Sequence, residues 1–211
     1  MQSITQVMRG HKPVIAVVTI VHPAHALSIA KALNKGGVSI LEFTLRNKHG
    51  LDAIKIVREE MPDLCVGAGT LIKPAQFATT KKAGAQFSVS PGLTPALIRA
   101  ASDQQTPYLP GATTPSEIMI GIENGFSVLK FFPAQSSGGL NFIKDLAGPF
   151  PEVKFCPTGG VDESNIHRYL STDNVLCAGT SWLTPQKLVQ EENWEELTRR
   201  ARIMTKSLAV I

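Results

Sequence analysis

The chain has 211 residues, of which 43% are hydrophobic, and its 17 Gly and 14 Pro are spread along its length. These values predict one globular domain over residues 1–211 with a full apolar core, and they exclude a disordered chain. The net charge is +4 without a basic run interleaved with aromatics, and no apolar run reaches the length of a membrane span, so neither nucleic acid nor a membrane is a predicted partner.

Short apolar runs alternate with longer helical stretches, which is the pattern of parallel strands joined by crossover helices. The predicted strands are residues 14–19, 40–45, 65–70, 87–90, 108–111, 128–132, 154–157 and 175–179. The predicted helices are residues 24–34, 51–61, 74–83, 95–103, 115–124, 140–146, 164–170 and 194–208. The pattern predicts an α/β protein with a (β/α)8 TIM barrel. A doubly wound open sheet is the alternative, because periodicity alone does not close a barrel.

The cysteines and histidines bear on the compartment and on metal chemistry. Cys65, Cys156 and Cys177 are an odd number set in apolar runs, which is typical of buried thiols in a reducing compartment and predicts a cytoplasmic protein. His22 and His25 are near each other, but no ligand cluster accompanies them. We therefore predict neither a metal site nor a cofactor.

Two predicted strands carry charged residues on their inward face. In residues 41–46, apolar and polar side chains alternate, so the apolar face meets the helices and Glu42 points into the barrel. In residues 128–133, the same argument turns Leu129 and Phe131 outward and Lys130 inward. Burial disfavours a charged ammonium, which favours the neutral amine that Schiff-base chemistry requires. The alternative is a buried ion pair without chemistry.

Further candidate residues follow other strands, at the end where barrel enzymes bind substrates. Glycine-rich turns at residues 157–161 and 178–182 follow the seventh and eighth predicted strands, where backbone N–H groups commonly bind phosphate. Thr70 ends the third strand, where its hydroxyl is placed either to reach a substrate carboxylate or to cap a turn. The turns at 90–92 and 110–115 shape the mouth of the barrel.

Six motifs, in this order along nearly the whole chain, resemble those of the 2-keto-3-deoxy-6-phosphogluconate (KDPG) and 4-hydroxy-2-oxoglutarate (KHG) aldolases. They are Leu-Glu-Phe-Thr-Leu-Arg (41–46), Val-Gly-Ala-Gly-Thr (66–70), Ser-Pro-Gly-Leu (90–93), Lys-Phe-Phe-Pro-Ala (130–134), Cys-Pro-Thr-Gly-Gly (156–160) and Gly-Thr-Ser-Trp (179–182). The resemblance implies a class I aldolase that forms pyruvate from KDPG in the Entner–Doudoroff pathway, and also from KHG. It also implies a homotrimer acting on a small 2-keto acid.

By this resemblance, Lys130 forms the Schiff base and Glu42 is the general acid and base. The other implied substrate-binding residues are Arg46 and Thr70 at the pyruvate carboxylate, and Pro91, Phe132 and Thr158. The implied phosphate-binding residues are Gly159, Gly160, Gly179, Thr180 and Ser181.

Two positions depart from the family pattern. Gln135 stands where the family usually has Glu, and Thr180 stands where a second Gly is common. An alternative function is a sugar-phosphate isomerase or synthase in which Glu42 is the base and Lys130 only pairs with it, so that turnover survives Lys130→Arg. A non-catalytic phosphate-binding barrel is a third possibility, against which the intact Glu42 and Lys130 pair counts.

Overall fold

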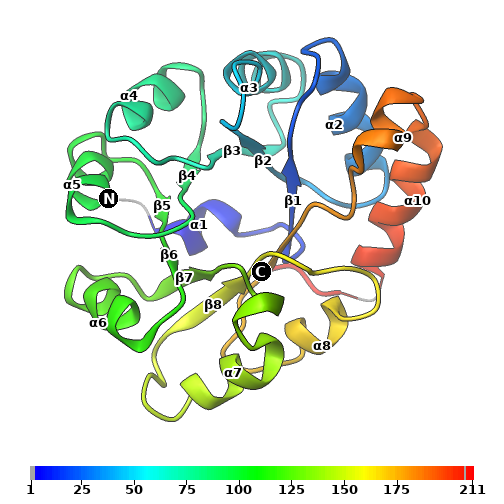
Figure 1. The fold of residues 1–211 in the computed structure, drawn as a ribbon. Coiled ribbons are helices and arrows are strands. Elements are labelled where there is room, and N and C mark those ends of the chain that lie inside the picture. Colours follow the sequence, from blue (N-terminus) through cyan, green and yellow to red (C-terminus); the bar gives the residue numbers. More distant parts are fainter. Residues whose placement is uncertain (1–2, 207) are drawn as a thin grey trace.

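The computed structural model describes residues 3–206 and 208–211 and shows strands in the middle of the molecule with helices around them (Figure 1). The strands are β1 (Val14–Val18), β2 (Ile40–Thr44), β3 (Cys65–Gly69), β4 (Phe87–Val89), β5 (Tyr108–Leu109), β6 (Gly111–Ala112), β7 (Val128–Phe131), β8 (Lys154–Pro157) and β9 (Ala178–Thr180). The helices are α1 (Ile4–Met8), α2 (His25–Lys35), α3 (Gly50–Glu60), α4 (Ala75–Lys82), α5 (Pro95–Asp103), α6 (Pro115–Glu123), η1 (Gln135–Ser137), α7 (Gly139–Leu146), α8 (Ile166–Leu170), α9 (Gln186–Gln190) and α10 (Trp194–Thr205).

The strands form a curled, parallel arrangement, as expected for an α/β protein. In the described residues a six-stranded sheet has the order β5-β4-β3-β2-β1-β9, and a three-stranded sheet has the order β6-β7-β8. Backbone contacts connect the two sheets at both of their edges. Lys130 N on β7 donates to the carbonyl of Pro110, which lies between β5 and β6. On the other side, isolated bridges join Phe155 to Val175 and Thr158 to Gly179.

Alternation along the strands divides the buried side chains into two clusters. Leu41 and Leu129 belong to the cluster that packs between the strands and the outer helices. Ile40 and Val128, one residue earlier on the same strands, belong to the cluster inside the curled sheets. The predicted facing of both strands is therefore confirmed.

Five predicted strands end one residue earlier in the structure, and two others differ by more. Residues 108–111 were expected to form one strand, but β5 and β6 are separated at Pro110, which has no N–H to donate to a ladder. Residues 175–179 were expected to form the last strand, but β9 covers Ala178–Thr180. The segment before it pairs only locally with β8, since Leu176 N donates to Phe155 O, and Ala178 N then donates to Pro13 O before β1.

The helices agree with the prediction to within a few residues at their ends. The helix expected at 164–170 begins at Ile166, and Ser164 N in the turn before it donates to the side chain of Asp162. The helix expected at 194–208 ends at Thr205, and residue 207 of that prediction lies outside the described residues. The sequence did not predict α1, η1 or α9. Figure 1 shows α1 lying across the middle of the ring of strands, and its buried Ile4 and Met8 join the interior cluster.

Candidate active site

Glu42 on β2 and Lys130 on β7 meet inside the curled sheets. Their side chains are 3% and 7% exposed, and Lys130 Nζ lies 3.5 Å from Glu42 Oε1. Each is two residues beyond an interior apolar residue of the same strand, Ile40 and Val128, so strand alternation alone turns both inward. The two residues that the sequence placed together are thus close in space.

The ammonium of Lys130 and the carboxylate of Glu42 are in contact without forming a direct hydrogen bond. At 3.5 Å the separation exceeds that of a direct ammonium–carboxylate hydrogen bond, about 2.7–2.9 Å. Among the described residues, Glu42 Oε1 is a buried acceptor without a hydrogen-bond partner. Buried acceptors are normally satisfied, and exceptions gather at functional sites. Glu42 Oε1 can therefore accept a hydrogen bond from a hydroxyl or water bound beside the amine.

Gly69 of β3 makes space for the Glu42 carboxylate and Gly67 makes space for the ring of Phe87, a function that the sequence reading missed. A Cβ on Gly69 would clash with the carboxylate of Glu42, and one on Gly67 would clash with the ring of Phe87. Gly67 pairs with Glu42 in the register of β2 and β3. The sequence does show two glycines on one face of this strand, because alternation turns residues 65, 67 and 69 to the same side. It does not show which side chains of the neighbouring strands need the space.

Replacing Gly69 with Ala is expected to lower both stability and activity. The new methyl group forces Glu42 to move, which we expect to cost about 1–3 kcal/mol of unfolding free energy. The displaced carboxylate is expected to lower kcat by roughly 100-fold. Urea unfolding and steady-state kinetics measure the two effects. Gly148→Ala is the matched control, since its Cβ makes only an ordinary contact, 3.8 Å from Asp145 O. A Gly69→Ala protein with unchanged kcat would show that Glu42 has room to move.

The predicted substrate-binding residues lie in different settings. Phe132 follows β7, and its ring centroid is 5.2 Å from Lys130 Nζ. Thr70 directly follows β3 and has a φ of 63°, a conformation that costs a non-glycine residue energy and often marks a functional site. Arg46 was expected on the inward face of the strand, but β2 ends at Thr44 and Arg46 is exposed in the following turn. Pro91 packs against Gly111, where a Cβ would clash with its carbonyl.

The predicted phosphate residues come together at the ends of β8 and β9. Thr158 is buried, and a Cβ on Gly179 would lie 2.5 Å from its hydroxyl. Gly159 and Gly160 have φ values of 98° and 76°, which glycine adopts without strain. In the described part of the chain, the backbone N–H groups of Gly160 and Ser181 form no hydrogen bond. Free backbone donors in such a turn can bind an anion.

Thr180 has a different role from the one its position in the motif suggests. Its hydroxyl donates to the carbonyl of Val161 at 2.6 Å and accepts from the N–H of Trp182 at 3.0 Å. The residue is 1% exposed. The side chain therefore ties the two glycine turns together and leaves only backbone atoms of Thr180 for a ligand.

A thiol also lies beside the amine, which the sequence reading did not place in the site. Cys156 pairs with Lys130 in the register of β7 and β8. The hydrogen bond with Cys177 lowers the pKa of the Cys156 thiol below its ordinary value, against the effect of burial, and the nearby charge of Lys130 lowers it further. The same hydrogen bond and burial raise the pKa of Cys177 well above its ordinary value. Both thiols belong to the interior cluster.

A family model described as KDPG and KHG aldolase matches residues 4–200. The KHG/KDPG aldolase of Escherichia coli (strain K12) is 44% identical over 190 residues, which cover 90% of this chain and 89% of that protein. The chain belongs to the KDPG/KHG aldolase family. It is thus an aldolase, a carbon–carbon lyase, as the ordered motifs and the paired Lys130 and Glu42 predicted.

Other proteins similar to this aldolase are also named as aldolases. The 2-dehydro-3-deoxy-phosphogluconate aldolase of Pseudomonas aeruginosa is 45% identical over 189 residues, covering 90% of this chain and 86% of that protein. A KDPG aldolase structure from Legionella pneumophila, with pyruvate captured as a covalent carbinolamine intermediate, has a TM-score of 0.91 at 39% identity and covers 95% of this chain and 97% of that chain. A Zymomonas mobilis KDPG aldolase with 3-phosphoglycerate has a TM-score of 0.87 at 39% identity, covering 95% and 93%.

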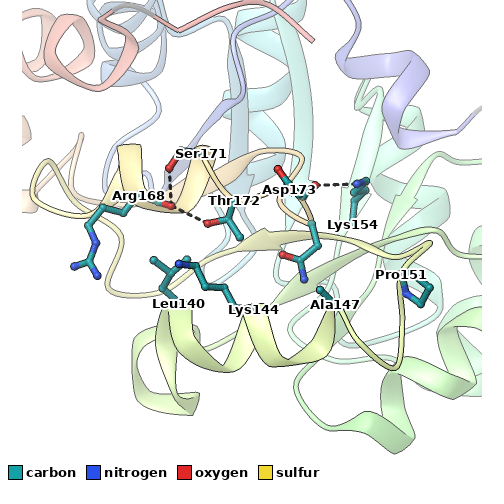
Figure 2. A pocket seen from close by; sticks show the side chains of 10 residues that line it. Leu140, Lys144, Ala147, Pro151, Lys154, Arg168, Ser171, Thr172 and Asp173 are labelled. Carbon is teal, nitrogen blue, oxygen red and sulfur yellow. Dashed lines mark hydrogen bonds between the residues drawn. The ribbon is translucent and has the colours of Figure 1, made fainter.

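A surface cavity of about 540 Å³ in this aldolase lies between α7, α8 and the start of β8 (Figure 2). Lys154, the first residue of β8, lines it and donates to the backbone oxygen of Asp173 at 2.8 Å. Neither Glu42 nor Lys130 contributes to its lining. The cavity thus lies near the amino-terminal end of β8, whereas the phosphate-binding candidates follow the carboxyl ends of β8 and β9. Within residues 3–206 and 208–211, no helix is long and apolar enough to cross a membrane.

Proposed function

We propose that this aldolase cleaves KDPG to pyruvate and glyceraldehyde 3-phosphate through a Schiff base on Lys130, and that it also cleaves KHG to pyruvate and glyoxylate. The observation that carries the proposal is the buried contact between Lys130 Nζ and Glu42 Oε1, an oxygen that accepts no hydrogen bond within the described residues. The names of the relatives support both substrates. The carbinolamine of the Legionella protein supports covalent chemistry with pyruvate.

The proposed reaction begins with the neutral amine of Lys130, which attacks the keto carbon to form a carbinolamine. Loss of water gives a protonated imine. Glu42 then takes the proton from the hydroxyl on the carbon beyond the breaking bond. As that bond breaks, an aldehyde leaves, and the electron pair of the broken carbon–carbon bond passes into the protonated imine to form an enamine. Glu42 returns a proton to the enamine carbon through water, and hydrolysis of the imine frees pyruvate and Lys130.

The surrounding residues are proposed to bind the two ends of the substrate. Arg46 and Thr70 bind the pyruvate carboxylate, since the planar guanidinium can hold two oxygens at once. Pro91, Phe132 and Thr158 line the space between the two ends. The proposed phosphate site consists of the turns that follow β8 and β9, with backbone groups of Gly159, Gly160, Gly179 and Thr180, and Ser181. The N–H groups of Gly160 and Ser181, which form no hydrogen bond within residues 3–206 and 208–211, support this assignment.

The finer architecture is part of the same proposal. We infer that the two sheets close into one (β/α)8 barrel, because bonds at Pro110 and the bridges at Val175 and Gly179 join both pairs of edges. We take residues 1–211 as a single barrel domain. The three buried, free thiols support a cytoplasmic location.

A homotrimer is the proposed assembly. Helix α6 exposes Met119, Ile120 and Ile122, each more than 40% exposed, and adjacent exposed apolar side chains often mark an interface between subunits. Sedimentation equilibrium is expected to give three times the mass of the 22.7 kDa chain. A mass equal to that of one chain would remove this part of the proposal.

Reductive trapping tests the proposed function. Borohydride in the presence of pyruvate is expected to fix the imine as a stable adduct on Lys130, which peptide mass spectrometry locates. In parallel, cleavage rates are compared for the six-carbon phosphorylated and the five-carbon unphosphorylated keto acid, and both are expected to release pyruvate. Absence of the Lys130 adduct would reject the Schiff base. Release of pyruvate without an adduct would mean that Lys130 only pairs with Glu42.

A further inference from the structure

Gln135 is held against the glycine turn that follows β8. It comes five residues after Lys130, at the start of η1. Its backbone N–H donates to Gly159 O at 3.1 Å, and the preceding Ala134 N donates to Thr158 O at 2.7 Å. These two bonds fix the position of Gln135 relative to the turn.

The side chain of Gln135 lies across Gly160. A Cβ on Gly160 would be 2.5 Å from Gln135 Cγ, and a Cβ on Gly139 would be 2.8 Å from Gln135 Oε1. Each glycine thus leaves space that this side chain occupies. Since Gln135 is itself exposed, a ligand bound at the Gly160 N–H can reach its amide.

A buried tyrosine orients that amide. The hydroxyl of Tyr169 on α8 donates to Gln135 Oε1 at 2.7 Å, and Tyr169 is 1% exposed. With the oxygen held by Tyr169, the amide nitrogen is left as a donor. In the described part of the chain this nitrogen forms no hydrogen bond. A phosphate dianion has only acceptors, so a free donor beside the turn suits it.

We propose that Gln135 sets the preference of this aldolase for phosphorylated substrates. Its amide nitrogen donates to the phosphate at the Gly159–Gly160 turn, and Tyr169 is the positioning residue that keeps the amide in this orientation. The inference rests on the proposed phosphate site. A Glu at this position accepts the same Tyr169 hydroxyl but faces the phosphate with a like charge and without the donor.

The test replaces Gln135 with Glu and measures both keto acids. For the phosphorylated substrate, KM is expected to rise by roughly 5- to 10-fold at unchanged kcat, because one unit charge acts on a dianion in partly screened surroundings. For the unphosphorylated substrate, KM is expected to stay the same. Inhibition of its cleavage by inorganic phosphate is expected to weaken by a similar factor. Gln104→Glu, at the end of α5, is the matched control for net charge.

Tyr169→Phe provides a second variant, which keeps the ring but frees the amide. It is expected to raise KM for the phosphorylated substrate only, by less than Gln135→Glu does. An equal rise for both substrates would overturn the inference, since it indicates a general disturbance of the site. Wild-type protein that shows neither a phosphate preference nor phosphate inhibition would reject the proposed phosphate site itself. Wild type with both properties and an unaffected Gln135→Glu variant would reject only the role of Gln135.

Discussion

Replacing Lys130 with Arg is expected to reduce aldol cleavage by on the order of 10⁵-fold, as removal of a covalent nucleophile does in other enzymes. Arg keeps the positive charge beside Glu42, but its guanidinium stays protonated and cannot attack a keto carbon. The pair is 3.5 Å apart in the native protein. The variant therefore removes the nucleophile and keeps the positive charge beside Glu42. Pyruvate release and the borohydride adduct are both measured, and both are expected to be lost.

Two comparisons make the Lys130 result interpretable. Lys154→Arg is the matched control, because Lys154 begins β8 and contacts the backbone of Asp173, away from the site. Lys130→Met tests crowding, since Arg is larger than the buried Lys and Met is not. Thermal unfolding of all three variants shows whether they fold. If the Lys130→Arg protein folds and retains turnover within tenfold of wild type, Lys130 serves only to pair with Glu42, as in the isomerase or synthase alternative.

The facing of the central side chains could be predicted from the sequence because a strand has a fixed period of two. Leu41 and Leu129 had to face the helices, which determined the direction of Glu42 and Lys130 one residue later. No long-range information was needed for this step. The same rule failed beyond Thr44, because the strand ends there and Arg46 lies in a turn.

Features that depend on a neighbouring strand could not be predicted in this way. The need for Gly69 arises only when the register places β3 beside the Glu42 carboxylate. The role of Thr180 depends on the carbonyl of Val161, nineteen positions away in the sequence, and the motif gave no sign of it. Both are contacts between elements, and the alternation within one strand does not reveal which residues of a neighbouring element lie beside it.

The short helix α1 was missed for a different reason. It has five residues, too few for a helical period to stand out, although Ser3 and Gln6 form a capping box at its start. Burial stabilises this helix, because Ile4 and Met8 pack into the interior cluster. A helix this short is stabilised mainly by tertiary contacts and carries little local signal.

Replacing Glu42 with Gln is expected to lower kcat by about 10²- to 10⁴-fold while leaving imine formation on Lys130. The amide keeps the size of the side chain but cannot accept a proton. The direct readout is exchange of the methyl protons of pyruvate with D₂O, followed by NMR, because exchange requires proton removal from the imine to form the enamine. Exchange is expected to fall as kcat does, whereas borohydride trapping of pyruvate persists.

Trapping and exchange, measured in both variants, distinguish the role of Lys130 from that of Glu42. Lys130→Arg is expected to lose both trapping and exchange, since no imine forms, and Glu42→Gln to lose only exchange. Glu152→Gln, an exposed carboxylate in the loop before β8, is the matched control and should keep both. Exchange at the wild-type rate in Glu42→Gln would assign proton transfer to another group. Loss of trapping as well would mean that Glu42 is needed to form the imine, either when Lys130 adds to the keto carbon or when the carbinolamine loses water. In either case Glu42 Oε1, which has no hydrogen-bond partner in the described part of the chain, would have a function other than the one proposed.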